Sequence, residues 1–154
     1  MKNPLCESTI DSKDFANKDF SGSKFIDCQF VDCNLSMTKL NKTGLQEVKF
    51  KDCKMLGLRF DDCNAFGLSF SFDGCQLNHA SFYKTKIKKT VFKNSQLQGT
   101  EFSEADLTEV VFDHCNLADA IFDIVSSGST LVSNRLKEVE VVVKSEAVDR
   151  KSVV

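Results

Sequence analysis

A bulky apolar residue recurs at every fifth position along most of this chain, and this repeat constrains the fold more than any other feature. The series runs from Leu5 to Phe70, shifts by two residues, and continues from Phe72 to Phe122. A period of five fits neither the α-helix, at 3.6 residues per turn, nor the β-strand, at two. It fits a chain that winds into stacked coils and turns one bulky side chain inward on each side.

A second position, two residues before each bulky one, is small along most of the chain, as at Cys28, Thr43 and Ala80. We expect small side chains there because the bulky residues already fill the lumen at native packing density. Ala65 is the one small residue at a bulky position, and Leu58 and Leu68 are larger residues at the small position. The pattern therefore predicts a filled tube with no pocket inside it.

Segments such as "ADLTEVVF", "CNLADAIF" and "CQLNHASF" resemble the pentapeptide-repeat family over roughly residues 5–123. The resemblance implies an all-β solenoid, a right-handed quadrilateral β-helix with four pentapeptides, or 20 residues, in each coil. Residues 1–123 would form about six coils, with a register slip near 66–72 that kinks or offsets the rod. Residues 124–154 would form a C-terminal cap or tail.

Two patterns in the sequence support a coil of 20 residues independently of the family. Sorted at this spacing, the bulky residues give two opposite walls of Phe and two aliphatic walls, one of which includes Ala65. Charges one coil apart also alternate in sign, as in the column Lys42, Asp62, Lys84 and Glu104, with eight opposite-sign pairs and no like-sign pair from residue 42 onward. Stacked coils lie ~4.8 Å apart, so these charges would be direct neighbours.

The repeat stops in the C-terminal tail. Val132, Leu136, Val139 and Val143 recur at helical spacing, and Ser129 is suited to cap the N-terminus of a helix. The run "EVEVVV" alternates as a strand does, so a strand remains the alternative. We expect a helix that covers the last coil or meets a second subunit.

The residue types that carry chemistry do not form a catalytic or metal site. Seven Cys, an odd number without an export signal, predict reduced thiols in the cytosol. Four of them, Cys33, Cys53, Cys75 and Cys115, fall in one inward column without a CxxC pair, which indicates structural thiols and no metal site. His79 and His114 lie at outward positions without a nucleophile and carboxylate arranged around them. We therefore predict no enzyme activity, no catalytic residues and no cofactor.

The net charge of −2 gives no reason to expect direct nucleic-acid or membrane binding. With no apolar run of transmembrane length and no signal peptide, we expect a soluble, cytoplasmic protein.

With no catalytic or metal site predicted, we expect recognition on the outer surface, whose C-terminal part is acidic. Residues 94–134 contain no Lys or Arg and seven carboxylates, which we take as the candidate binding surface: Glu101, Glu104, Asp106, Glu109, Asp113, Asp119 and Asp123. Around "CNAFGLSFSFDGC" the chain is also similar to the Qnr-type and microcin-immunity branch of the family.

That branch consists of DNA mimics that bind DNA gyrase and topoisomerase IV. The resemblance implies protection of a type II topoisomerase from quinolones or toxins, a hinge at Gly67, and a homodimer formed through the C-terminal region. The alternative is a protein-interaction scaffold with an unknown partner, because Glu104, Asp106, Glu109 and Asp113 each have a lysine one coil away. These four charges would then belong to ordinary cross-coil ladders.

Overall fold

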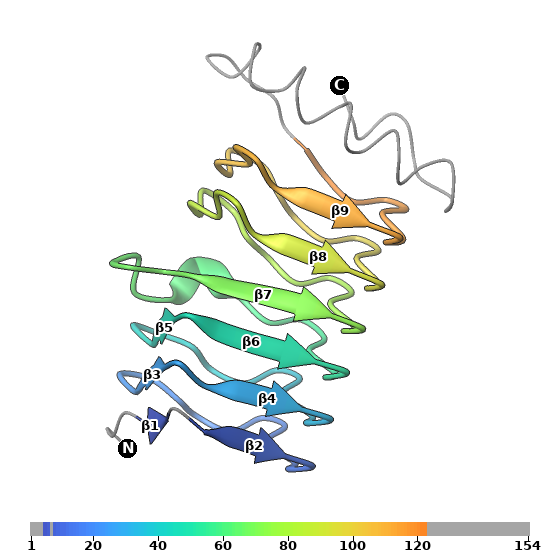
Figure 1. Cartoon of the computed structure of the whole chain (residues 1–154). Helices are drawn as coiled ribbons and strands as arrows, with labels where there is room; N and C mark the ends of the chain where they lie inside the picture. Colours follow the sequence, from blue (N-terminus) through green and yellow to red (C-terminus); the bar gives the residue numbers. More distant parts are fainter. Residues whose placement is uncertain (1–4, 7, 123–154) are drawn as a thin grey trace.

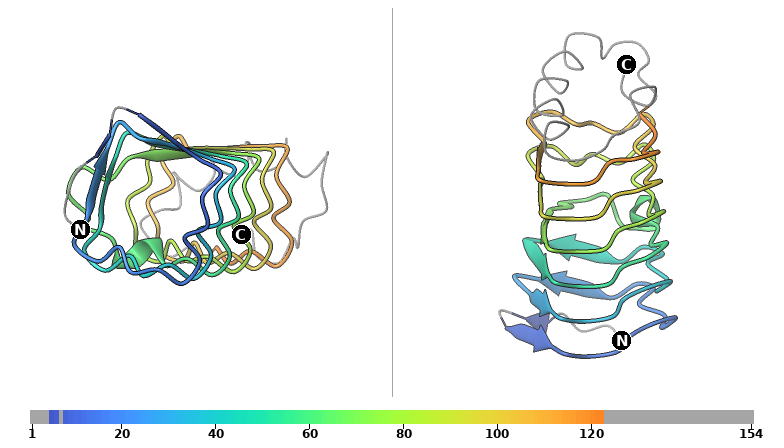
Figure 2. Two further views of the ribbon diagram at one scale, coloured as in Figure 1. Left: turned by 90° about the horizontal axis from the view of Figure 1, so that it is seen from below. Right: turned by 90° about the vertical axis from the view of Figure 1, so that its right-hand side faces the viewer.

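The computed structural model describes residues 5–6 and 8–122 of the 154-residue chain. In this part the chain winds upward as a stack of coils (Figure 1), and the end-on view in Figure 2 shows their four-sided outline. The predicted all-β solenoid is confirmed, since helix in the described residues is limited to the short 3-10 turn η1 (Phe60–Asp62). Asp123 and the expected helix or strand in 124–154 lie outside the described residues.

The strands are short and pair only in parallel. They are β1 (Leu5–Cys6), β2 (Thr9–Asp11), β3 (Lys24–Ile26), β4 (Gln29–Val31), β5 (Gly44–Gln46), β6 (Val48–Lys51), β7 (Phe70–Asp73), β8 (Val91–Lys93) and β9 (Val111–Asp113). One wall is a six-stranded sheet in the order β2-β4-β6-β7-β8-β9, and a second wall begins as a three-stranded sheet in the order β1-β3-β5. Bridges of single residue pairs connect successive coils on the other sides.

The strand register fixes the coil length. Phe30 pairs with Phe50, and Phe92 pairs with Phe112, so equivalent residues are 20 apart. Between these pairs Phe50 faces Phe72, which means that this one coil contains two additional residues.

Each corner is made by a backbone turn that the repeat specifies. Outside the segment from Phe60 to Phe70, the residue two places after the bulky one has a positive φ, as at Asn17 (63°) and Asp119 (62°). At many corners the amide one residue later donates to the bulky residue's carbonyl, as Lys18 does to Phe15 over 3.0 Å. An Asp or Asn just before the bulky residue stabilises the turn, since its side chain accepts the amide two residues on, as Asp14 does from Ala16 at 3.0 Å.

Two ladders of stacked phenylalanine rings fill the lumen. On the six-stranded wall, consecutive rings of Phe30, Phe50, Phe72, Phe92 and Phe112 have centroids 5.0–5.3 Å apart. The second ladder stacks Phe60, Phe82, Phe102 and Phe122 with centroids 4.7–5.3 Å apart. The ladders meet edge to face, as Phe82 meets Phe92 at 5.6 Å and 82°, which is a favoured aromatic geometry. The two predicted Phe walls are thus confirmed.

The additional residues do not interrupt these ladders; they leave the wall as a bulge between η1 and β7. Ala65, expected inside, is exposed, and Leu68 is half-buried against the core instead. The bulge closes over β5, because Asn64 donates its amide to the Thr43 carbonyl at 2.8 Å and Ser69 donates to Leu45 at 2.9 Å. Across the bulge the two Phe walls stack without a break, and the expected kink or offset of the rod as a whole stays a prediction.

Candidate functional site

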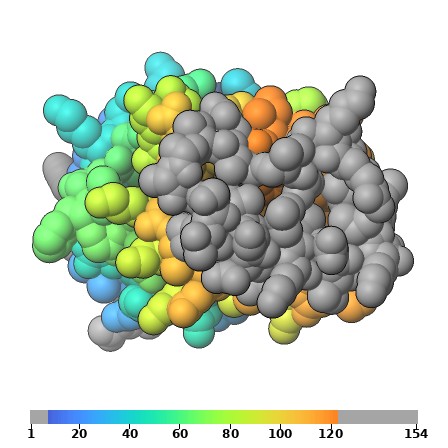
Figure 3. All heavy atoms as spheres, turned by 90° about the horizontal axis from the view of Figure 1, so that it is seen from above, coloured from blue at the N-terminus to red at the C-terminus, as the bar shows by residue number. Residues whose placement is uncertain are grey.

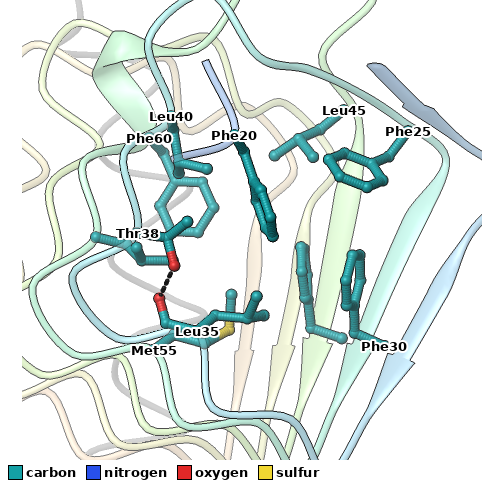
Figure 4. Close-up of a pocket in the computed structure, with 11 residues that line it drawn as sticks. Phe20, Phe25, Phe30, Leu35, Thr38, Leu40, Leu45, Met55 and Phe60 are labelled. Carbon is teal, nitrogen blue, oxygen red and sulfur yellow. Dashed lines mark hydrogen bonds between the residues drawn. The ribbon is translucent and has the colours of Figure 1, made fainter. Parts of the chain in front are cut away.

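The lumen contains a small cavity, so the prediction of a tube without any pocket is wrong. The cavity has a volume of about 20 Å³, which is roughly the space for one water molecule. Apolar side chains surround it in the N-terminal coils (Figure 4), and the one polar lining group, the Thr38 hydroxyl, donates to the Leu35 carbonyl at 2.5 Å. A space of this size and polarity offers no room or chemistry for a substrate.

The column of cysteines is buried and hydrogen-bonded to the backbone. The Sγ atom of Cys53 donates to the Phe30 carbonyl at 3.4 Å, and that of Cys115 donates to the Phe92 carbonyl at 3.2 Å. The hydrogen bond with Cys75, together with burial, raises the pKa of the Cys53 thiol, and burial raises that of Cys33. The same hydrogen bond lowers the pKa of Cys75, which accepts it. Cys33 and Cys53 are thus held as protonated, buried thiols, which are poor nucleophiles and poor metal ligands. Within the described residues, no three His, Cys, Asp or Glu side chains are placed to hold a metal ion.

One cysteine outside this column differs from the expectation. Cys28 is disulfide-bonded, so the prediction of reduced thiols throughout is wrong at this position. Cys33, Cys53, Cys63, Cys75 and Cys115 are free.

The predicted acidic surface is arranged as a belt around the rod. Glu101 to Asp119 span 19 residues, almost one full coil, so their side chains lie on successive walls and corners. Asp113 is on the six-stranded wall in β9, Glu101 is on the wall of the second Phe ladder, and Glu104 and Asp119 are at left-handed corners. The view from above shows orange atoms of this coil on several sides of the rim (Figure 3). We call the six described carboxylates the acidic belt: Glu101, Glu104, Asp106, Glu109, Asp113 and Asp119.

Cross-coil lysines neutralise part of the belt. Lys84 pairs with Glu104, and Lys89 pairs with Glu109, each with a nitrogen–oxygen distance of 3.9 Å. Of the eight expected opposite-sign pairs, all between described residues, these two come within 4.0 Å.

Two more carboxylates of the belt face a lysine in the coil below, and each also contacts a residue close to it in the sequence. Asp106 faces Lys86, and its Oδ1 accepts the Thr108 amide at 3.1 Å. Asp113 faces Lys93, and its Oδ1 lies 2.6 Å from Nδ1 of His114.

Glu101 and Asp119 are the two carboxylates of the belt that face no Lys or Arg one coil away among the described residues. Glu101 lies between Ser81 and Ile121 in the register. The corner residue one coil below Asp119 is Gly99. The uncompensated negative charge of the belt is therefore concentrated at these two positions.

Gly67, the predicted hinge, lies in the bulge with a φ of +65°. A Cβ added there would come 3.1 Å from Nε2 of Gln46, so both the backbone angle and the close approach favour glycine. The turn is held by neighbours on both sides, and its role as a hinge stays a prediction.

One exposed residue of the bulge has no place in the predicted site. Phe66 is 78% exposed, whereas every other Phe of the chain is buried or half-buried. Its position in the sequence could have indicated this exposure, because Phe66 is the one Phe outside both the bulky series and the small position of the repeat.

The family model for the pentapeptide repeat region matches residues 11–71 and 68–142. QnrB1, a plasmid-mediated fluoroquinolone resistance protein, is 20% identical over 89% of this chain and 98% of its own, with a TM-score of 0.40. HetL of Nostoc sp. strain PCC 7120, a pentapeptide repeat protein involved in heterocyst differentiation regulation, is 14% identical over 73% of this chain and 62% of its own, with a TM-score of 0.41.

Curated relatives match only a short stretch. ATP phosphoribosyltransferase of Bacteroides thetaiotaomicron is 96% identical over 24 residues, which are 16% of this chain and 8% of that protein. The enzyme of Bacteroides fragilis is 92% identical over 24 residues, again 8% of its length. The chain thus spans less than a tenth of these relatives. In the described part of the chain, no helix is long and apolar enough to cross a membrane.

Proposed function

Because the chain belongs to the pentapeptide repeat family, we propose that it is a non-enzymatic binding protein whose partner is a type II topoisomerase, DNA gyrase or topoisomerase IV. The observation that carries the proposal is the filled lumen, whose cavity of about 20 Å³ leaves the outer surface for recognition. Bound in this way, the protein protects the topoisomerase from quinolones or toxins. A cytoplasmic location and the absence of a cofactor are part of the same proposal.

The acidic belt is the proposed contact. A surface that binds DNA is basic, because it neutralises phosphates, and a band of carboxylates is electrostatically complementary to it. Glu101 and Asp119 contribute most to this attraction, since the other four described carboxylates have a lysine in the neighbouring coil. In this proposal a single coil of the rod mimics DNA, because its carboxylates take the place of the phosphates of a duplex.

A gyrase supercoiling assay with ciprofloxacin tests this proposal. The protein should restore supercoiling at micromolar concentration, and the double variant Glu101→Gln/Asp119→Asn should restore much less. The matched control Glu104→Gln/Glu109→Gln removes the same formal charge from carboxylates already paired to Lys84 and Lys89. It should keep most of the activity. Absence of rescue by the unaltered protein rejects the topoisomerase as partner.

The second candidate is a protein-interaction scaffold for another partner, and the cross-coil pairs favour it. If this candidate is right, the unaltered protein gives no rescue in the supercoiling assay, and both double variants pull down the same partner as the unaltered protein.

A homodimer formed through the C-terminal region belongs to the main proposal, since it would place two acidic belts on one assembly. The mass of the full chain in solution tests this: a monomer at every concentration up to that of the binding assays rejects the dimer.

A further inference from the structure

The bulge between η1 and β7 presents a single aromatic side chain to solvent. Phe66 is 78% exposed, and its neighbours Ala65 and Gly67 are also exposed. The flanking Phe60 and Phe70 are buried, and their rings meet edge to face at 5.3 Å inside the lumen. The chain thus leaves the core after Phe60, exposes Phe66, and returns to the core at Phe70.

Hydrogen bonds hold the bulge in this conformation. The Phe66 amide donates to Oδ1 of Asn64 at 2.9 Å, which closes an Asx-type turn directly at the exposed ring. At the far end, the Ser69 hydroxyl donates to Oε2 of Glu47 at 3.1 Å. Together with the backbone bonds from Asn64 and Ser69 to the coil below, these contacts anchor both ends of the bulge.

We propose that the bulge is a second docking element, in which Phe66 inserts into an apolar pocket on the folded protein partner. A large aromatic ring on an anchored turn gains buried apolar area on binding and loses little conformational freedom, the combination typical of interface hot spots. This inference rests on the proposed protein-binding function, and it adds a contact that does not depend on the acidic belt.

The surroundings of Phe66 indicate a protein pocket and not a membrane or a nucleic acid. The nearest charged side chains along the chain are Asp61 and Asp62, and Glu47 bonds to the end of the bulge. Arg59 contacts both aspartates, at 2.7 and 3.7 Å. The coil above the bulge carries four exposed lysines at positions 84, 86, 88 and 89. Three of them are compensated from the next coil, since Lys84 and Lys89 pair with Glu104 and Glu109 at 3.9 Å and Lys86 faces Asp106. A site whose charges are mostly paired offers phosphates little net attraction, and a single Phe offers too little apolar area for stable membrane binding.

The first test measures the affinity of full-length protein for purified DNA gyrase. Phe66→Ser should weaken binding about 30-fold or more, as expected for removal of a hot-spot side chain. The control Met37→Ser removes an apolar side chain that is 57% exposed at another corner and should change affinity less than about twofold. Circular dichroism of both variants should match the unaltered protein. Equal affinities of Phe66→Ser and the unaltered protein for gyrase would overturn the inference.

A second test separates this inference from the identity of the partner. Benzoylphenylalanine placed at position 66, or at position 37 as the control, is photo-activated in bacterial cells that express the full chain. A discrete protein adduct at 66 and not at 37, which excess unaltered protein suppresses and Phe66→Ser protein does not, supports the docking element even where gyrase fails to bind. Equal adducts at both positions, or none at 66, would refute it.

Discussion

Removing the ring of Phe102 tests whether the lumen is held together by stacked aromatic side chains. Phe102 is 1% exposed and stacks on Phe82 at 5.3 Å and on Phe122 at 5.1 Å. It also meets Phe92 at 6.0 Å and Phe112 at 5.6 Å, both edge to face. The Phe102→Ala variant therefore loses contacts to four rings at once and leaves a cavity that the coils above and below cannot close.

Truncation of a buried Phe to Ala costs about 3–5 kcal/mol in the free energy of unfolding. We expect a value in the upper half of this range, because each aromatic pair adds about 0.5–1.5 kcal/mol beyond the area that it buries.

Urea unfolding followed by circular dichroism measures the difference. The denaturant slope must be compared as well, because coils contact only their neighbours and the C-terminal ones can unfold separately. Phe66→Ala is the matched control, since the same truncation at an exposed ring should change stability by less than about 0.5 kcal/mol. If Phe102→Ala unfolds at the same urea concentration as the unaltered protein, the packed aromatic lumen is refuted.

Three further predictions address the corners, the thiols and the surface charges. Gly22→Ala should lower the melting temperature, because Gly22 has a φ of +76° in otherwise open space and only the backbone angle opposes a Cβ there. An unchanged melting temperature would contradict this. Burial raises the pKa of Cys63 to about 12, above its unfolded value, so the thiol's contribution to stability is present below about pH 9 and is lost as pH rises toward 12. Urea midpoints measured from pH 8 to 11 should therefore fall more steeply in the unaltered protein than in Cys63→Ala, and parallel curves would argue against a buried thiol. Lys84→Met should change the unfolding free energy by less than about 1 kcal/mol, because its pair with Glu104 is exposed; a loss of several kcal/mol would show that these ladders are structural.

The sequence predicted the parts of the fold that recur in every five-residue repeat. A bulky residue every fifth position specifies which side chain enters the lumen, so the stacking of Phe82, Phe102 and Phe122 followed directly from their spacing of 20. The corner turns were not predicted, although they are equally local: an Asp or Asn before the bulky residue caps the amide two positions later.

The bulge could not be predicted because two additional residues can leave a coil at several places. Counting by five placed Ala65 inside, and only the pairing of β6 with β7 shows that the register recovers by exposing residues 64–67 as a bulge. The cavity in the N-terminal coils depends on the packing of particular side chains, such as Met55 and Leu45, which residue types alone do not determine.

The arrangement of the acidic residues illustrates a different limit. Carboxylates close together in sequence suggested a continuous acidic surface, but a coil of 20 residues distributes them around all sides of the rod. The columns of opposite charge were correctly aligned, yet the distance between two charged ends depends on side-chain rotamers, and most of the eight pairs remain more than 4.0 Å apart.

Hydrogen exchange of the full chain with and without gyrase tests the central claim, that a filled solenoid recognises its partner by its outer surface. In the complex, we expect slower exchange of the amides in residues 101–119, where the acidic belt lies, and in residues 64–67 of the bulge. Amides of β4 and β6, which are already bonded within the six-stranded wall, should be unchanged. Unaltered exchange in both regions, or protection confined to β4 and β6, would contradict the account.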